Sequence, residues 1–232
     1  MWLVLCHAND LSALWAYQGL KARGLSPLEL VSTESLAFSL RWEHRVDSEG
    51  ASFRITLADG RHIYSEDVCG ALNRIQFVPL PHWEHATASD RDYVQQELTA
   101  FYTSWLLSLP GPVLNPVTSL GLSGRWRTPI EWMKLAANSG FATDRSVPEP
   151  TDPPLPASKT IIVADQFVSS DEYGADSCRQ LATLSQTPIL GIDLKPLNDN
   201  KLRFVRANTM PDLRLGGPGI LDSLKVSLEG RA

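Results

Sequence analysis

Residues able to do chemistry stand at several places in the 232-residue sequence, the first of them close to the N-terminus. The apolar run 3–6 predicts a strand, and the polar residues Asn9 and Asp10 follow shortly after it. Open α/β sheets bind ligands at the carboxyl ends of their strands, so Asn9 and Asp10 are a candidate ligand cleft. Capping of the helix expected from residue 11 explains the same two residues without a ligand.

Three other groups of residues fit a structural role better than a chemical one. Segment 82–85, His-Trp-Glu-His, holds two imidazoles and a carboxylate, but in a Pro-flanked loop rather than at i and i+4 of a zinc-binding helix. Cys6 and His7 are adjacent in a strand and therefore point to opposite faces. The Gly-rich segment 216–219 precedes a helix but lacks the pattern of a phosphate-binding loop, so it predicts a turn.

The most informative residues lie on two expected strands, 189–194 and 202–208. The first contains Gly191-Ile192-Asp193-Leu194, and the second leads into Arg206-Ala207-Asn208-Thr209-Met210-Pro211. This order and spacing resemble the end of an ATP-grasp ligase, in the glutamate-ligase and peptide-ligase branch that joins amino acids or peptides through carboxylates. Leu114-Asn115-Pro116, followed by the helix that ends at Gly140, resembles the start of the family's nucleotide-binding region.

The resemblance implies a magnesium and nucleotide site. In the family, an Asp on one strand and a Glu and an Asn two residues apart on the next surround the metal with oxygen atoms, because strand residues i and i+2 share one face. The matching residues here are Asp193, Arg206 and Asn208. A guanidinium cannot ligate magnesium and repels it at close range, so these three residues are expected to form a degenerate metal and nucleotide site.

Two further departures from the family concern ATP itself. The family's phosphate-binding Lys falls at or close to Pro129, and only the largely Pro-rich residues 141–158 replace the subdomain that clamps ATP. Phosphoryl transfer needs positioning and neutralised charge. We therefore predict a truncated, noncatalytic ATP-grasp homologue with no catalytic residue, metal or cofactor, acting as a binding or scaffold partner in a ligase or peptide-modification pathway.

Two alternatives remain open at this stage. One is an ATP-dependent carboxylate–amine ligase with a minimal or partner-completed site, which would use ATP and Mg through Asp193 and Asn208. The other is an α/β module that binds a small metabolite without ATP. Loss of a subdomain would expose surface, so the expected partners are a protein or a second copy of the chain, with a peptide or small metabolite as a further ligand.

Composition excludes several classes of protein. The chain has 21 basic and 26 acidic residues, a net charge of −5, which disfavours a nucleic-acid footprint. No basic segment precedes the apolar run 2–6, so neither a signal peptide nor a membrane span is expected. The three cysteines, Cys6, Cys69 and Cys178, are widely spaced, which favours a reducing cytoplasm.

The elements that must position these residues predict an α/β fold. We expect a Rossmann-like N-terminal domain, similar to the domain that precedes the ATP-grasp region, with a β-meander, and a smaller ATP-grasp-like α+β C-terminal part. Alternating apolar residues predict strands at 36–46, 53–57, 62–64 and 71–78. Helices are expected at 11–22, from about residue 90 to Pro110, and after the capping residue Thr128.

The expected domain boundaries follow from these elements. Residues 1–116 form the N-terminal domain, and 117–146 a connecting helix region. Residues 147–158 form a Pro-rich connector, and 159–232 a remnant of the C-terminal ATP-grasp subdomain.

Overall fold

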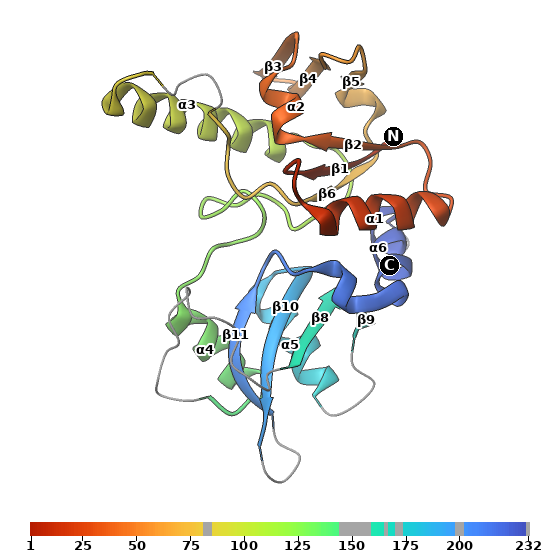
Figure 1. Cartoon of the computed structure of the whole chain (residues 1–232), viewed down its shortest axis with the longest axis vertical. Coiled ribbons are helices and arrows are strands. Elements are labelled where there is room, and N and C mark those ends of the chain that lie inside the picture. Colours follow the sequence, from red (N-terminus) through yellow and green to blue (C-terminus); the bar gives the residue numbers. More distant parts are fainter. Residues whose placement is uncertain (81–84, 144–158, 165–166, 170–173, 198–201, 231–232) are drawn as a thin grey trace. The chain divides into compact units, whose positions relative to one another are not determined.

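The computed structural model describes residues 1–80, 85–143, 159–164, 167–169, 174–197 and 202–230 (Figure 1). They form two compact units, Met1–Ser123 with Val226–Ala232, and Gly124–Lys225. The expected connector 147–158 and the expected turn at 198–200 lie outside the described residues.

The first unit contains a four-stranded parallel sheet with the order β2-β1-β6-β7. Its strands are β1 (Trp2–Cys6), β2 (Leu28–Ser32), β6 (Gly70–Asn73) and β7 (Val113–Leu114). Helix α1 (Leu11–Ala22) returns the chain from β1 to β2, and Asp10 caps it by accepting the backbone N–H of Ala13. Strand β2 pairs with one side of β1, whereas β6, which comes later in the chain, pairs with the other side. The direction in which strands are added to the sheet therefore reverses between β1 and β6.

The same unit carries an antiparallel meander, β3 (Arg41–Asp47), β4 (Gly50–Thr56) and β5 (His62–Tyr64), in that order. The short helix α2 (Thr33–Ala37) precedes it and the 3₁₀ turn η1 (Ser65–Asp67) follows. The strand expected at 36–46 is wrong over its first residues. Ser32 caps a helix there by accepting the backbone N–H of Ser35, and the strand begins only at Arg41.

The strand expected at 71–78 is also too long. Strand β6 ends at Asn73, whose Oδ1 accepts the backbone N–H of Ile75 at 3.2 Å. The Asn73 Nδ2 donates to the backbone carbonyls of Asn115 and Leu122 at 3.0 and 2.6 Å. The buried amide therefore takes the chain out of the sheet by offering hydrogen bonds that compete with those of a longer strand.

The core of the first unit joins the parallel sheet, the meander and helix α3 (Ala88–Leu107). Trp105 of α3 is fully buried and meets Trp42 of β3 and Phe53 of β4 edge-on, with ring centroids 4.9 and 6.0 Å apart. Figure 1 shows α1 along the parallel sheet, with α2 and the meander on the opposite side. Trp105 thus packs where α3 meets two strands of the meander.

The second unit contains an antiparallel sheet with the order β11-β10-β8-β9. Its strands are β8 (Lys159–Ala164), β9 (Phe167–Val168), β10 (Ile189–Pro196) and β11 (Leu202–Asn208). Helices α4 (Pro129–Asn138) and α5 (Ala175–Ser185) share a buried apolar cluster with β8, β10 and β11. The capping box predicted at the start of α4 is confirmed: Thr128 and Glu131 exchange the expected hydrogen bonds.

The chain ends in the 3₁₀ turn η3 (Leu213–Gly216) and helix α6 (Gly217–Leu228). The predicted fold class is confirmed, since one unit contains a parallel α/β sheet with a meander and the other is an antiparallel α+β unit. Within the part of the chain that the structure describes, every helix is too short or too polar to span a membrane.

The buried Trp105 gives a direct test of this core. Trp105→Ala should lower the free energy of unfolding by about 3–5 kcal/mol, because it leaves a cavity between α3 and the meander. Leu107→Ala on the same helix is the matched control; Leu107 is 67% exposed, and the change should stay within about 0.5 kcal/mol. Urea unfolding followed by circular dichroism measures both, and equal losses would contradict the packing described.

Candidate functional site

Asp193 and Arg206 form an ion pair across two neighbouring strands. They lie opposite each other in the pairing of β10 with β11, beside an irregularity in the register after Asp193. The Arg206 Nε donates to the Asp193 Oδ2 at 2.6 Å. The Asp193 side chain is 11% exposed and that of Arg206 38% exposed, so the carboxylate is nearly buried beneath a partly exposed guanidinium.

The second oxygen of Asp193 is also taken. Thr160 of β8 lies opposite Asp193 on the other side of β10, and its hydroxyl donates to the Asp193 Oδ1 at 2.6 Å. Both oxygens therefore accept a short hydrogen bond from a neighbouring strand. A buried carboxylate needs such partners, because an unpaired charge in the interior is costly.

Asn208 makes contacts of a different kind. Its Oδ1 accepts the backbone N–H of Met210 at 2.8 Å, and its Nδ2 donates to the Met210 carbonyl at 3.1 Å. Opposite Asn208 in the sheet stands Gly191, where a Cβ would lie 2.7 Å from the Cβ of Pro211. The glycine therefore lets the chain fold back over β10, and the Asn208 amide holds the turn that does so.

Of the three residues predicted to form a degenerate metal site, the structure brings Asp193 and Arg206 into contact. In the described part of the chain the Asn208 side chain bonds to neither of them. Magnesium needs near-octahedral oxygen ligands, and here the two carboxylate oxygens are committed and a cation stands beside them. The donor set does not fit magnesium.

Thr160 was not predicted from the sequence to belong to this site. Its position at the start of the apolar strand 160–164 could have indicated a role there. A lone hydroxyl residue at the start of such a strand needs a hydrogen-bond partner once it is buried. Among the described residues, no group of three or more His, Cys, Asp or Glu is placed to hold a metal ion. Residues 82–84 of the His-Trp-Glu-His segment, which was considered as a metal site, lie outside the described residues.

The candidate cleft at the end of β1 shows a second carboxylate paired with an arginine. The Arg74 Nε donates to the Asp10 Oδ2 at 2.7 Å, and both side chains are largely buried. The two residues meet because they follow β1 and β6, neighbouring parallel strands whose carboxyl ends share one edge of the sheet. Asn9 is exposed, so capping and this ion pair account for Asp10, and a ligand at Asn9 and Asp10 stays a prediction.

His7 is buried at the same edge of the sheet. Its Nε2 accepts the backbone N–H of Gln76 at 3.2 Å, so in the neutral ring its Nδ1 carries the proton and donates to the Thr33 hydroxyl at 2.9 Å. The ring also stacks on Phe77 with centroids 4.0 Å apart. Burial lowers the pKa of His7 below its ordinary value, although the nearby carboxylates of Glu34 and Asp10 oppose this effect.

The remaining sequence candidates have structural roles. Burial raises the pKa of the Cys6 thiol to about 12, so it stays protonated and does not form a nucleophilic pair with His7. Gly219 lies in α6, where a Cβ would come 2.8 Å from the ring of Phe167, so close packing explains that glycine. Pro129 occupies the first turn of α4 beside its capping box.

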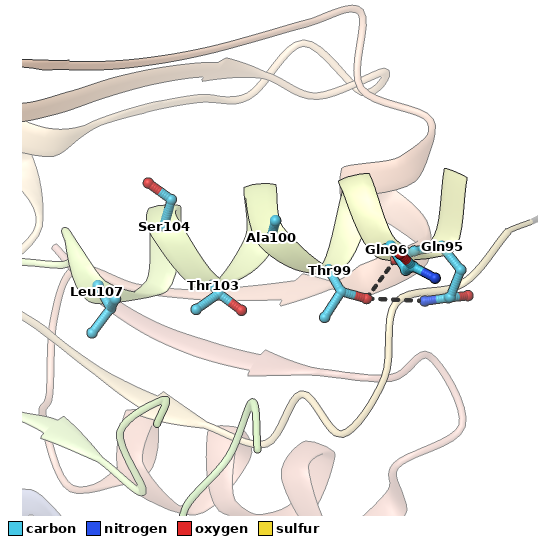
Figure 2. Close-up of a pocket in the computed structure, with 7 residues that line it drawn as sticks. All are labelled: Gln95, Gln96, Thr99, Ala100, Thr103, Ser104 and Leu107. Carbon is cyan, nitrogen blue, oxygen red and sulfur yellow. Dashed lines mark hydrogen bonds between the residues drawn. The ribbon is translucent and has the colours of Figure 1, made fainter. Parts of the chain in front are cut away.

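Figure 2 shows an open pocket along α3, and the residues of that helix that line it are Gln95, Gln96, Thr99, Ala100, Thr103, Ser104 and Leu107. Two of them bond to each other: the Gln95 Nε2 donates to the Thr99 Oγ1 at 3.2 Å, and that hydroxyl donates to the Gln95 carbonyl. No residue predicted from the sequence to bind a ligand lines this pocket.

No protein-family model and no curated protein sequence matches the chain. Solved structures do. The macrocyclase MdnC from Microcystis aeruginosa MRC, bound with the precursor peptide MdnA, matches with a TM-score of 0.73 and 11% identity over 99% of both chains. A RiPP-associated ATP-grasp ligase from Chryseobacterium gregarium, in complex with ADP and a leader and core peptide, matches with a TM-score of 0.70 and 11% identity, covering 100% of this chain and 97% of its own.

The ATP-grasp ligase PsnB, complexed with a minimal precursor, Mg and ADP, gives a TM-score of 0.69 and 16% identity over 99% of this chain and 97% of its own. At such low identities the likeness shows the fold.

The pair of Asp193 and Arg206 should show energetic coupling. Arg206→Met should lower the free energy of unfolding by about 1.5–3 kcal/mol, because it leaves a buried charge with half of its hydrogen bonds. Asp193→Asn/Arg206→Met should cost less than the sum of the two single changes by about 1 kcal/mol or more. Urea unfolding of all four proteins gives the coupling energy. Strict additivity would mean that the two side chains do not interact.

His7 should make stability depend on pH. The folded protein favours the neutral ring, so its contribution is fully present above pH about 6.5, the ordinary pKa, and is lost as the pH falls through the lower pKa of the folded state. Urea unfolding between pH 7.5 and 5.0 should therefore show stability falling toward acid pH. His7→Gln should flatten this slope. This pH range lies above the range in which Glu34 titrates, because the pKa of Glu34 lies below its ordinary value. Equal slopes in the wild-type protein and in His7→Gln would contradict the assignment of this pH dependence to His7.

Proposed function

The chain has the fold of the ATP-grasp ligases along nearly its whole length, and from this premise we propose that it is a noncatalytic homologue that binds a peptide in a peptide-modification pathway. The observation that carries the proposal is the ion pair of Asp193 and Arg206. It stands where the family resemblance requires a magnesium ligand.

The contacts of Asp193 support the loss of catalysis. A metal at this carboxylate would lie close to the Arg206 guanidinium, whose Nε is 2.6 Å from the Asp193 Oδ2, and would compete with the Thr160 hydroxyl for the Oδ1. The repulsion between the two cations makes metal binding at this carboxylate unfavourable. Without a metal, no divalent cation neutralises the charge that develops on a transferring phosphoryl group at this position. The loss of the family's Lys at Pro129 and the short segment 141–158 support the same conclusion.

The peptide part of the proposal draws on the similar structures. MdnC was crystallised with its precursor peptide, and the Chryseobacterium gregarium ligase with a leader and a core peptide. A homologue that lost ATP chemistry could keep the peptide, either for an active ligase or within an assembly of several copies. The three cysteines of this chain are free, as suits a protein that works in the cytoplasm.

One observation favours a second candidate, an ATP-dependent carboxylate–amine ligase whose site is minimal or completed by a partner. The similar structures of PsnB and of the Chryseobacterium gregarium ligase contain ADP, and that of PsnB also contains Mg. For this candidate, Arg206 would have to swing away from Asp193 when nucleotide and metal arrive. The Arg206 side chain is 38% exposed, so such a movement has room.

Titration of the full chain with magnesium and ATP separates the two candidates. By isothermal titration calorimetry we expect no saturable binding up to millimolar ATP, because Arg206 and Thr160 hold Asp193. Arg206→Glu, which restores the carboxylate of the family pattern, should instead gain magnesium-dependent binding.

Asp176→Asn is the matched control for a change of charge, because the Asp176 side chain is fully exposed on α5. Saturable binding by the wild-type chain that Asp193→Asn abolishes and Asp176→Asn does not would favour the ligase and overturn the noncatalytic proposal.

A further inference from the structure

The meander has one buried face and one exposed face. Trp42, Phe53, Ile55 and Ile63 point into the core. The alternate residues point outward: on β3 they are Arg41, Glu43, Arg45 and Asp47, and the residues paired with them and with one another on β4 and β5 are Gly50, Ser52, Arg54, Thr56, His62 and Tyr64. Residues directly opposite each other in a sheet share a face, so these side chains form one surface, called here the arginine face.

The arginine face carries a positive excess on an acidic protein. It holds three arginines against the two carboxylates of Glu43 and Asp47, whereas the whole chain has a net charge of −5. Arg41 donates to Glu43 through its Nε at 3.0 Å. That hydrogen bond, together with the charges of Arg41, Arg45 and Arg54, holds the pKa of Glu43 below its ordinary range. Glu43 therefore lies among three guanidinium groups, and with Asp47 at the end of β3 the two carboxylates leave one positive charge in excess.

Two of these arginines are available to a ligand. Arg45 and Arg54 are exposed, and in the described part of the chain neither guanidinium has a hydrogen bond or an ion pair. Most other arginines of the first unit are committed: Arg61 holds Asp59 and Glu29, and Arg74 holds Asp10. An exposed guanidinium binds a carboxylate through two parallel N–H groups.

The spacing of the three arginines fits an extended peptide. Arg41 and Arg45 are four residues apart on β3, which corresponds to about 13 Å along a strand. Arg54 lies opposite Glu43, midway between them. An extended peptide places the side chains of alternate residues on one side at about 6.6 Å intervals. Three acidic residues at alternate positions would therefore meet Arg41, Arg54 and Arg45 in turn.

We propose that the arginine face binds an extended acidic peptide segment with carboxylates at alternate positions. His62 and Tyr64, stacked with their centroids 6.0 Å apart on β5, flank the arginines and offer a flat surface for the aliphatic parts of the peptide. This inference rests on the proposed function in one respect, since both require a peptide ligand. A long polyanion fits less well, because it would also meet the negative excess of the rest of the chain.

The test is the binding of a short fluorescein-labelled peptide of alternating Glu and Ser, followed by fluorescence anisotropy with the full-length protein. We expect Arg45→Gln/Arg54→Gln to weaken binding about tenfold. The control Arg91→Gln/Arg125→Gln removes the same charge from two exposed arginines elsewhere and should leave the affinity within about twofold. Binding should weaken as NaCl is raised, because exposed ion pairs are screened.

Circular dichroism shows whether each variant is folded. If the double variant is unstable, the single change Arg45→Gln replaces it in the test, and we expect it to weaken binding about threefold. Failure of the peptide to bind, equal binding of a Gln/Ser peptide, or equal affinities of the two double variants would overturn the proposal. So would tighter binding of an oligouridylate RNA through the same arginines. The magnesium–ATP titration is unaffected by any of these results, so this inference and the noncatalytic proposal fail independently.

Discussion

The ion pair between Asp193 and Arg206 is the constraint on which the chemistry of the second unit depends. It joins β10 to β11, and the Thr160 hydroxyl joins the same carboxylate to β8, so one buried charge links three of the four strands. A carboxylate in that position is stable in the interior only while it is paired. The contacts that make the charge tolerable are also the contacts that occupy both of its oxygens.

The first unit repeats this arrangement at a different place. Asp10 stands at the reversal of the parallel sheet, where open α/β sheets bind ligands, and it is paired with the largely buried Arg74 while it caps α1. In both units, an acidic residue at a position suited to ligand chemistry is held by an arginine that follows or lies on a neighbouring strand. Two exposed arginines, Arg45 and Arg54, lie on the outer face of the meander, where a sheet surface suits an extended ligand better than a small molecule.

Much of the fold was predictable because local patterns and tertiary packing agree. The alternation of apolar residues in β4 and β5 and the capping box of α4 each specify one structure. The failures have local causes that compete with the apolar pattern. At residues 36–40 the Ser32 cap overrides an alternation typical of a strand, and after Asn73 a buried side-chain amide replaces the ladder hydrogen bonds. Neither cause is visible in the period of the apolar residues.

The sequence by itself determined the identity and order of the residues at the candidate site: an aspartate, an arginine and an asparagine at fixed spacing on two successive strands. Side chains two apart on a strand share a face, and this holds whatever surrounds them. Only the tertiary structure decided how the residues pair. The register of the strands places Arg206 and Thr160 on either side of Asp193. Pro211 packs closely on Gly191, and the Asn208 side chain bonds to Met210 rather than to Asp193. Hydrogen-bond partners are fixed by contacts between segments distant in the chain, which spacing along the sequence does not record.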